Sequence, residues 1–387
     1  MKNSLIFKES TLIYIHIPYC HHKCTYCAFY SNAGRREEQQ AYVEAVCEEL
    51  RQRSGEQTDH PIRTIYFGGG TPTLLPIELL SKIVATLRNL FDLTQLEEAT
   101  IEANPENLTS ENLEGLAGLH FFNRISIGIQ SFNANDLKLF NRVHTPEQAL
   151  DAIRNARQAG FHNISADLIY GIPGQTLSTW KENLQQIFAL PITHLSCYAL
   201  SLEPQSILWR QVESGKIAMP EEEAVLEAYE LLLQEAKAHG FGQYEISNFC
   251  KPGMPSRHNS RYWDRTPYLG IGAAAHSFDG KCRRWNVADT QHYIHSISNN
   301  ENYYESERLT EIQSFNEYIM TALRTTAGID KSALPKIAAQ IFDKQFRPAV
   351  ERQIQLGLLT ETPIHIIPTH DGLLQADGIA TKLMVEG

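Results

Sequence analysis

Short runs of β-branched and other apolar residues alternate with longer polar-apolar stretches over the first 240 positions of the chain. The short runs are typical of buried strands, and the longer stretches, rich in Ala, Leu, Glu, Gln and Arg, are typical of helices. Six strands are predicted at residues 12–17, 64–67, 99–103, 124–129, 163–169 and 194–200. Helices are predicted at residues 37–53, 76–91, 146–159, 177–189 and 221–239.

This strict alternation indicates βα units and a parallel sheet. Residues capable of chemistry follow the ends of the predicted strands, among them a cysteine loop, a glycine triplet, Glu102, Gln130 and Asp167. The rim at the carboxyl ends of the strands is where a βα barrel builds its active site. Six units rather than eight predict an α/β fold, a partial (β/α)6 barrel that is open on one side for a large ligand.

After residue 240 the pattern changes twice. Residues 241–305 are rich in Gly, Pro, His and aromatic residues, so we expect a loop-rich extension that covers the barrel. Residues 306–387 predict a C-terminal α+β, winged-helix-like module. Its expected elements are helices at 313–325, 331–342 and 347–356, a hairpin at 358–368 and a closing helix. The chain is thus divided into domains 1–240, 241–305 and 306–387.

Charge and composition exclude several classes of protein. The chain has 387 residues and a net charge of -11, so no general attraction to nucleic acid or anionic membranes is expected. No apolar run approaches the roughly 20 residues of a membrane span, and Lys8 and Glu9 interrupt the N-terminal apolar stretch. The seven cysteines show no disulfide framework. A cytoplasmic protein without a signal peptide is expected.

Three of the cysteines, Cys20, Cys24 and Cys27, follow the first predicted strand with the spacing CxxxCxxC. Three thiolates on one loop suit a 4Fe-4S cluster that leaves one iron open. That iron can be chelated by the amino and carboxylate groups of S-adenosylmethionine (SAM). Electron transfer from the cluster would then cleave SAM to a 5′-deoxyadenosyl radical, with the protein positioning and shielding the reactants.

A structural zinc site is the alternative for the same cysteines, with His16, His21 or His22 as the fourth ligand. The aromatic Tyr26 and a glycine triplet after the next strand favour the shielded cluster. The triplet, followed by Thr71 and Pro72, lacks the Lys-Ser/Thr ending of a phosphate loop.

The remaining polar candidates are each ambiguous alone. Glu102, Gln130 and Asp167 are predicted to form a ring around one pocket, although each could be a helix cap or an ordinary rim residue. Arg142 could bind a carboxylate or form a surface salt bridge. The sequence GIGAAA from Gly270 resembles a dinucleotide fingerprint but lacks its context, so close packing at the barrel edge is the favoured interpretation.

Together, the segments IYIHIPYCHHKCTYCAF, YFGGGTPTLL, IEANPE, ISIGIQSF, LIYGIPGQ and HNSRYW resemble the HemN/HemW group of radical SAM proteins. That group comprises the oxygen-independent coproporphyrinogen III dehydrogenases and the HemW haem chaperones. The resemblance is close over residues 12–280 and looser over the C-terminal module.

The resemblance implies specific roles for residues of this chain. Cys20, Cys24 and Cys27 would ligate the cluster. Tyr14 and the carbonyl side of Tyr26 would line the SAM pocket. Other matched positions would contact SAM through its methionine and ribose parts (Gly69, Gly70, Thr71 and Glu102) or, as in the dehydrogenase, a second SAM molecule (Gln130, Arg142, Asp167 and Ala199).

Two features of the resemblance favour the chaperone branch. Phe29 occupies the position where the dehydrogenases carry a further cysteine, and residues 258–263 match the HNxxYW motif typical of HemW. The resemblance therefore implies a radical SAM-type chaperone that binds haem as cargo, with His258 as a candidate haem ligand, and delivers it to haem-accepting proteins. An electron donor such as flavodoxin or ferredoxin is an expected partner. The alternative is an enzyme, an oxygen-independent coproporphyrinogen III dehydrogenase that forms protoporphyrinogen IX in porphyrin biosynthesis.

Overall fold

The computed structural model describes residues 11–32, 34–56, 61–204 and 206–387. The first ten residues, on which the expectation of no signal peptide depends, lie outside the described residues. No helix in the described ranges is long and apolar enough to cross a membrane.

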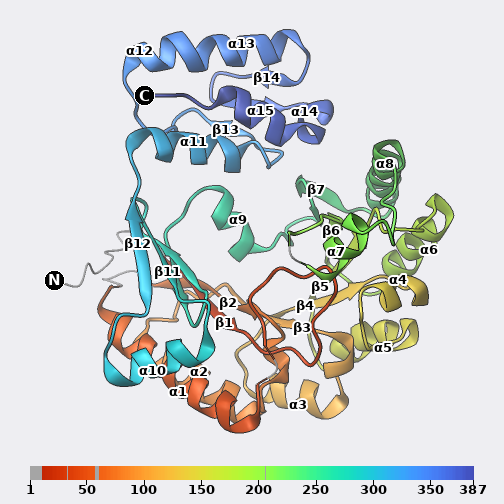
Figure 1. Cartoon of the computed structure of the whole chain (residues 1–387), viewed down its shortest axis with the longest axis vertical. Coiled ribbons are helices and arrows are strands. Elements are labelled where there is room, and N and C mark those ends of the chain that lie inside the picture. The colour runs from red at the N-terminus through yellow and green to blue at the C-terminus, as the bar shows by residue number, and fades with distance from the viewer. Residues whose placement is uncertain (1–10, 33, 57–60, 205) are drawn as a thin grey trace.

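The six predicted strands form the centre of a parallel sheet, in the order of the sequence (Figure 1). Each strand pairs in parallel with the next one along the chain, so the predicted βα topology is confirmed. Their inner and outer faces are both buried, which explains the nearly continuous apolar runs. The strands are β1 (Thr11–Ile17), β2 (Ile62–Gly69), β3 (Glu98–Ala103), β4 (Arg124–Gln130), β5 (Asn163–Tyr170) and β6 (His194–Ala199).

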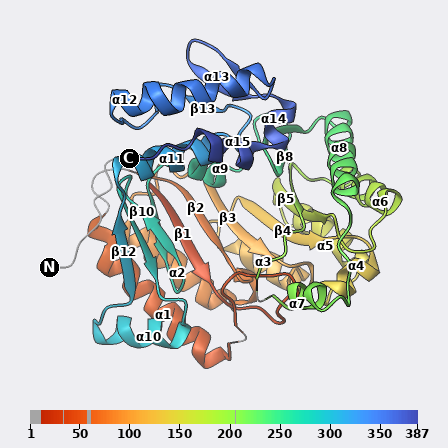
Figure 2. The same ribbon diagram turned by 45° about the horizontal axis from the view of Figure 1, so that its top comes forward.

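Helices cover the outer face of the curved sheet (Figures 1 and 2). Their starts are set by local capping, as at Thr145 and Thr176, whose side chains accept from the backbone three residues ahead in capping boxes. Their apolar faces join the strands in one large hydrophobic core. These helices are α1 (Arg36–Arg53), α2 (Ile77–Leu90), α3 (Ser110–Gly118), α4 (Ala134–Leu139), α5 (Pro146–Gln158), α6 (Leu177–Phe188) and α8 (Glu222–Ala238).

The segment 241–305 is not loop-rich, which corrects the expectation from its composition. Its short strands extend the sheet at both edges, so that this sheet has twelve strands among the described residues. At one edge β8 (Asn248–Cys250) and β7 (Gly242–Glu245) continue from β6; at the other, β9 (Tyr268–Ile271) pairs in parallel with β1. Strands this short, separated by Gly and Pro, leave too few positions for an alternating pattern to be recognised. Further elements here are α9 (Arg257–Trp263), β10 (His276–Phe278), β11 (Cys282–Asn286), α10 (Thr290–Asn299) and β12 (Tyr304–Arg308).

The GIGAAA segment packs at the barrel edge, as the sequence favoured. It ends β9 and leads into β10, not into a helix, so it is no dinucleotide loop. A Cβ at Gly270 would lie 1.8 Å from the His276 carbonyl oxygen. Gly272 has a φ of +104°, and a Cβ there would lie 2.6 Å from the Tyr42 hydroxyl. Both glycines are therefore needed for close packing of the chain on itself.

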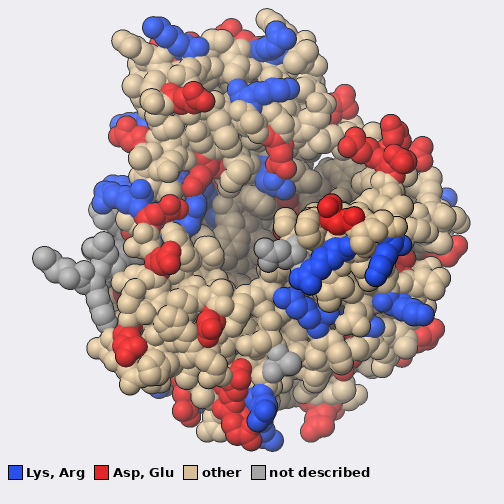
Figure 3. Space-filling model, in the orientation of Figure 1, with Lys and Arg blue, Asp and Glu red and all other residues tan. Residues whose placement is uncertain are grey.

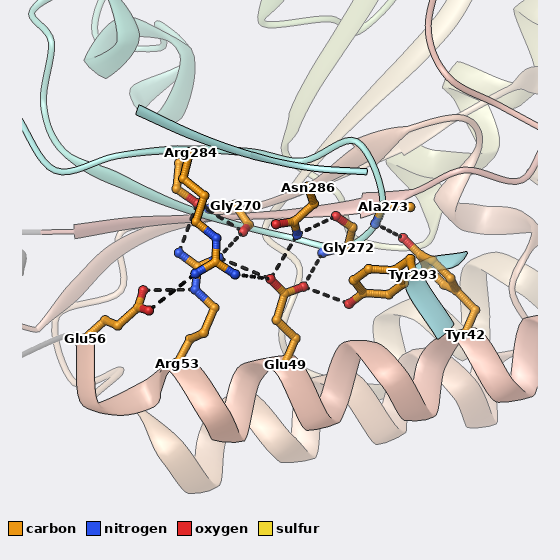
Figure 4. A network of polar contacts seen from close by, with 11 residues as sticks. Tyr42, Glu49, Arg53, Glu56, Gly270, Gly272, Ala273, Arg284, Asn286 and Tyr293 are labelled. Atoms are coloured by element: carbon orange, nitrogen blue, oxygen red, sulfur yellow. Dashed lines mark hydrogen bonds and ion pairs between the residues drawn. The ribbon is translucent and has the colours of Figure 1, made fainter. Parts of the chain in front are cut away.

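A buried ion network ties this segment to α1 (Figure 4). Glu49 is fully buried and accepts hydrogen bonds from the Gly272 amide at 2.8 Å and the Tyr293 hydroxyl at 2.7 Å. Arg53, also buried, pairs with Glu49 at 3.2 Å and donates to the Gly270 carbonyl at 2.8 Å. Arg284 reaches the same Glu49 carboxylate at 3.8 Å. The network locks the sheet extension onto the barrel.

The C-terminal module has a hydrophobic core of its own, separate from that of the barrel. Figure 1 shows it lying above the sheet, with α11 (Glu311–Ala322) facing α9. A three-stranded sheet in the order β13-β15-β14 includes the predicted hairpin. The other elements are β13 (Ile329–Asp330), α12 (Ala339–Ile341), α13 (Arg347–Gln355), β14 (Leu359–Glu361), β15 (His365–Pro368), α14 (His370–Leu374) and α15 (Ala376–Leu383).

One predicted helix of this module is wrong. Residues 331–338 form a turn and an extended segment, and regular helix begins only at Ala339. Pro335 lacks a backbone N–H and restricts the residue before it, so a helix through this position is disfavoured.

Candidate functional site

The cysteine loop is held against the ends of two strands by backbone hydrogen bonds. The Gly70 amide donates to the Ile17 carbonyl at 2.8 Å, and the Thr71 amide donates to the Tyr19 carbonyl at 2.7 Å. Further along the loop, Thr25 donates its amide to the Phe140 carbonyl at 3.1 Å and accepts from the Leu208 amide. The loop is thus positioned by β1, β2 and the segments after β4 and β6.

Cys20, Cys24 and Cys27 are half-buried free thiols on this loop. Burial raises the pKa of the Cys20 and Cys27 thiols, so a metal must displace their protons on binding. Among the described residues, no three His, Cys, Asp or Glu side chains are placed to hold one metal ion. The zinc alternative needs ligands that converge on a single ion, whereas each thiolate of a 4Fe-4S cluster binds a different iron.

His16 is also unsuited to be the fourth zinc ligand. Its Nδ1 lies 3.0 Å from the Tyr14 hydroxyl and its Nε2 lies 3.2 Å from the Tyr30 carbonyl oxygen. Burial lowers its pKa to about 4, so the ring is neutral at neutral pH. His21 and His22 are exposed on the loop.

A chain of hydrogen bonds joins Cys20 to several of the residues predicted from the sequence. The Thr71 hydroxyl donates to the Cys20 sulfur at 3.6 Å, and the Asn104 amide donates to Thr71 at 3.0 Å. Arg142 in turn donates to the Asn104 side-chain oxygen at 2.9 Å and to the Gly128 carbonyl at 2.7 Å. Arg142 is therefore an interior residue behind the cysteine loop, not the partner in a surface salt bridge.

Gln130 lies in the same group and has an unusual backbone. Its φ is +68°, in the left-handed region that costs a side-chain-bearing residue conformational energy. The strain coincides with an irregularity in the β4–β5 pairing. A Cβ added at Gly128 would lie 2.9 Å from both Gln130 Nε2 and Arg142 Nη2, so the three residues meet at one point.

Glu102 links this group to the barrel interior. It accepts from the Tyr66 hydroxyl at 2.7 Å and from the Gly69 amide at 3.1 Å. Burial raises the pKa of Glu102 to about 7, although these two hydrogen bonds oppose the shift. Gly69 has a φ of +108°, and a Cβ there would lie 2.4 Å from the His16 ring. The glycine is needed for this turn whether or not a ligand approaches it.

The other predicted residues occupy two different places. Tyr14 and Asp167 face the barrel interior with Glu102, and burial raises the pKa of both side chains. Tyr26 lies at the cysteine loop, with its ring 4.6 Å from that of Phe140. Ala199 is exposed at the end of β6.

His258 on α9 is fully buried, in a polar cluster between the sheet and the C-terminal module. Its Nδ1 lies 2.7 Å from the Thr64 hydroxyl, and its Nε2 lies 2.9 Å from the Tyr262 hydroxyl. Glu98 accepts from the backbone amides of Arg257 at 2.9 Å and His258 at 3.0 Å, where a carboxylate is favoured by the helix dipole. Haem ligation by His258 stays a prediction, and it would require α9 to separate from β2, because both ring nitrogens are occupied.

Sequence analysis missed three residues that the structure places at the site. Asn104 carries the hydrogen bonds between Thr71 and Arg142, and Glu98 anchors α9. Arg124 begins β4 and is buried inside the barrel. Glu98 and Arg124 stand out in the sequence as charged residues at the starts of apolar strands, but the sequence pattern does not show that their side chains face inward.

Comparisons with known proteins agree with this geometry. Residues 14–187 match the Radical SAM superfamily model. Heme chaperone HemW of Bacillus subtilis is 35% identical over 365 residues, which cover 93% of this chain and 96% of that protein. The chain belongs to the HemW family of radical SAM proteins. Heme chaperone HemW of Escherichia coli is also similar, 31% identical over 97% of this chain and 98% of that one.

The HemW-family chain also shares its fold with a solved radical SAM enzyme. Coproporphyrinogen III oxidase (HemN) from Escherichia coli matches with a TM-score of 0.84 over 97% of this chain and 90% of that one. The sequence identity is 23%, so the likeness establishes the fold, including the partial barrel and the C-terminal module.

A 4Fe-4S cluster and SAM, which membership of the radical SAM family implies, fit the residues present. The three half-buried thiols lie on one loop, and the cationic Arg142 lies behind this loop, with its Nε buried and without a hydrogen-bond partner in the described structure. An anionic cluster beside this guanidinium would balance its charge. The polar interior next to Gly69 and Glu102 provides acceptors for the ammonium and hydroxyl groups of SAM.

Proposed function

We propose that this chain is a haem chaperone, which binds haem and delivers it to acceptor haemoproteins. The observation that carries the proposal is similarity over nearly the whole chain to proteins named heme chaperone HemW in distant bacteria. The similarity extends beyond residues 14–187, over the segments that form the extended sheet and the C-terminal module in this chain.

The surface offers room for a large flat ligand. Figure 3 shows a deep recess between the C-terminal module and the barrel elements below it. Two large apolar side chains at the rim of the barrel are strongly exposed, Phe29 at 71% on the cysteine loop and Tyr198 at 44% on β6. Exposed aromatic groups suit the stacking of a porphyrin.

Cys20, Cys24 and Cys27 would hold the cluster in this proposal, and the bound cluster with SAM supplies radical or electron-transfer chemistry. Thr71 would donate a hydrogen bond to the Cys20 thiolate and so stabilise its charge. Tyr14, Tyr26, Gly69, Gly70 and Glu102 are assigned to SAM on the strength of the family resemblance. Gln130, Arg142, Asp167 and Ala199 are assigned to a second SAM molecule on the same basis.

Exposed basic residues near the cysteine loop could bind an electron donor, which is part of the same proposal. Lys23 on the cysteine loop and Lys138 on α4 are exposed, and the Asn141 side chain joins the two segments by donating to the Lys23 carbonyl at 3.1 Å. Figure 3 shows basic side chains gathered beside the recess on a chain of net charge -11. An acidic electron donor such as a flavodoxin or ferredoxin would be attracted to this part of the surface. A cytoplasmic location is proposed for donor and chaperone alike.

Coproporphyrinogen III dehydrogenation is the alternative, and it is supported by fold alone. Phe29, which stands where the dehydrogenases carry a cysteine, points its exposed ring away from the core. No contact among the described residues favours decarboxylation over haem binding.

The proposal is tested by following haem in and out of the protein. The anaerobically reconstituted chain is titrated with haem, and the loaded protein is then mixed with an apo-form of a b-type haemoprotein. We expect binding of about one haem per chain and transfer faster than the release of haem to a buffer containing a haem scavenger alone. Equal rates of transfer and passive release would show a haem-binding protein without chaperone activity.

A further inference from the structure

A cavity of about 200 Å³ lies inside the barrel, between the sheet and α9. It is separate from the cysteine loop and is mostly polar. The side chains that line it come from the six strands β1 to β6 and from α9: Tyr14, Tyr66, Glu102, Arg124, Ser126, Asp167, Ser196, Tyr198, His258, Asn259 and Tyr262.

Arg124 is the unusual member of this lining. Its side chain is 1% exposed, and its Nε and Nη1 have no hydrogen-bond partner among the described residues. A buried donor without an acceptor costs free energy, and more so when it is charged. Two unpaired N–H groups of one guanidinium, buried in the wall of a cavity, indicate an acceptor that comes from a ligand.

The other titratable groups around Arg124 are two carboxyls and two imidazoles, and none of them hydrogen-bonds its Nε or Nη1 in the described structure. Glu102 and Asp167 face it across the cavity, and burial raises the pKa of both carboxyls, to about 7 for Glu102. His194 and His258 also lie near it, and burial holds the pKa of each below its usual range, so both rings are neutral at neutral pH. Among the described lining residues, Arg124 is thus the only cation.

The position of Arg124 separates this cavity from the cluster. Arg124 begins β4 and Gln130 ends it, so the two are about 20 Å apart along the strand. The carboxyl ends of the parallel strands carry the cysteine loop, whereas Arg124 belongs to the opposite end. A ligand group that pairs with Arg124 therefore reaches through the barrel interior, past Tyr14, Glu102 and Asp167, which line the same cavity and which the family resemblance assigns to SAM.

We propose that Arg124 binds a propionate carboxylate of the tetrapyrrole cargo, at the inner end of the barrel next to α9. This inference rests on the proposed haem-binding function and adds the group of the cargo that the protein recognises. A carboxylate presents two coplanar acceptor oxygens, which match two N–H groups of a guanidinium. The cavity has room for a propionate side chain and the edge of a ring, while the macrocycle would lie toward the open side near Tyr198, which is 44% exposed.

The experiment compares haem with its dimethyl ester, in which both propionates are uncharged. Both are titrated into the full-length, cluster-reconstituted protein and into Arg124→Gln and Arg124→Lys variants. We expect the wild-type protein to bind haem about tenfold to a hundredfold more tightly than the ester, the range for a charged hydrogen-bonded pair. Arg124→Gln should bind both with the affinity of the ester. Arg124→Lys keeps the charge without the planar fork and should give an intermediate preference.

Arg154→Gln serves as the matched control, because Arg154 is an exposed arginine on α5, and it should behave as the wild type. Wild-type protein that binds haem and ester equally would overturn the inference while leaving the haem function intact. Wild-type protein that binds neither would overturn the proposed function itself. Loss of SAM binding in Arg124→Gln, with haem binding unchanged, would assign the guanidinium to SAM and overturn the inference as well.

Discussion

Replacing His258 by alanine separates a structural role for the HNxxYW motif from a role in haem ligation. The imidazole bridges Thr64 on β2 and Tyr262 on α9 by hydrogen bonds of 2.7 and 2.9 Å in a fully buried position. Alanine removes both bonds, leaves two buried hydroxyls without that partner and opens a cavity beside the Tyr66 ring, whose centroid lies 5.1 Å from that of His258.

The size of the effect follows from these contacts. Two net hydrogen bonds contribute about 1 kcal/mol each, and the unsatisfied hydroxyls and the cavity add to the loss, giving about 3–5 kcal/mol in total. That is a large part of the roughly 5–15 kcal/mol by which domains are stable. We expect a fall in Tm of about 10 °C, taking ~2–4 °C per kcal/mol for a large domain.

The pH dependence gives a second, independent signature. Burial lowers the pKa of His258 to about 3, whereas an unfolded histidine titrates near 6.5. The unfolded chain therefore gains a proton first as the pH falls, so the contribution of His258 to stability is complete above about pH 6.5 and is lost toward pH 3. The free energy of unfolding should therefore fall less steeply with decreasing pH in His258→Ala than in the wild type. Some of the fall remains, because the buried His16 also has a lowered pKa.

Thermal and chemical unfolding are measured from pH 4 to 8, with the Soret spectrum of the haem-loaded protein recorded in parallel. His292→Ala is the control, because His292 is exposed on α10. We expect a large loss of stability with an unshifted Soret band at low temperature. A variant with wild-type Tm and a lost or shifted Soret band would refute the structural role and establish His258 as a haem ligand.

Three other predictions can be checked with single variants. The reconstituted wild-type protein should contain about four irons per chain, and replacing Cys20, Cys24 or Cys27 by serine should abolish this iron incorporation. A wild-type protein that binds one zinc tightly and takes up no iron would contradict the cluster assignment. Burial raises the pKa of Glu102 to about 7, so the folded protein should lose stability relative to the unfolded chain as the pH rises from about 4.5 to 7. Glu102→Gln should remove this dependence of the free energy of unfolding on pH. An unchanged pH dependence would show that another group ionises. Glu49→Ala should destabilise the chain by about 3–5 kcal/mol in chemical denaturation, because Arg53 keeps only Glu56 as a carboxylate partner and the buried donors Tyr293 and Asn286 lose their acceptor. A loss under about 1 kcal/mol would show that water replaces the carboxylate.

The sequence predicted the parallel core well, because strands buried on both faces leave long apolar runs and the helices between them are amphipathic. It did not predict the sheet extensions from β7 to β12, whose strands of three to five residues carry no recognisable period. It also placed a helix across Pro335, where tertiary packing holds an extended segment.

The site was predictable where spacing alone specifies chemistry. The CxxxCxxC spacing located the three thiols, and the ends of the strands located Glu102, Gln130 and Asp167. Arg124 and Glu98 could not be found in this way, because each begins a strand and only the sheet register shows which face it occupies. The motif around His258 was visible, but its burial against Thr64 depends on a contact across 194 positions of sequence.

The haem chaperone function is tested most directly by presenting the reconstituted protein, with SAM and a reductant, to haem and to coproporphyrinogen III in parallel. The account predicts that about one haem binds per chain, that the bound haem passes to an apo-haemoprotein, and that no decarboxylated porphyrin accumulates. Formation of protoporphyrinogen IX in step with consumption of SAM would contradict the account and place this chain among the dehydrogenases.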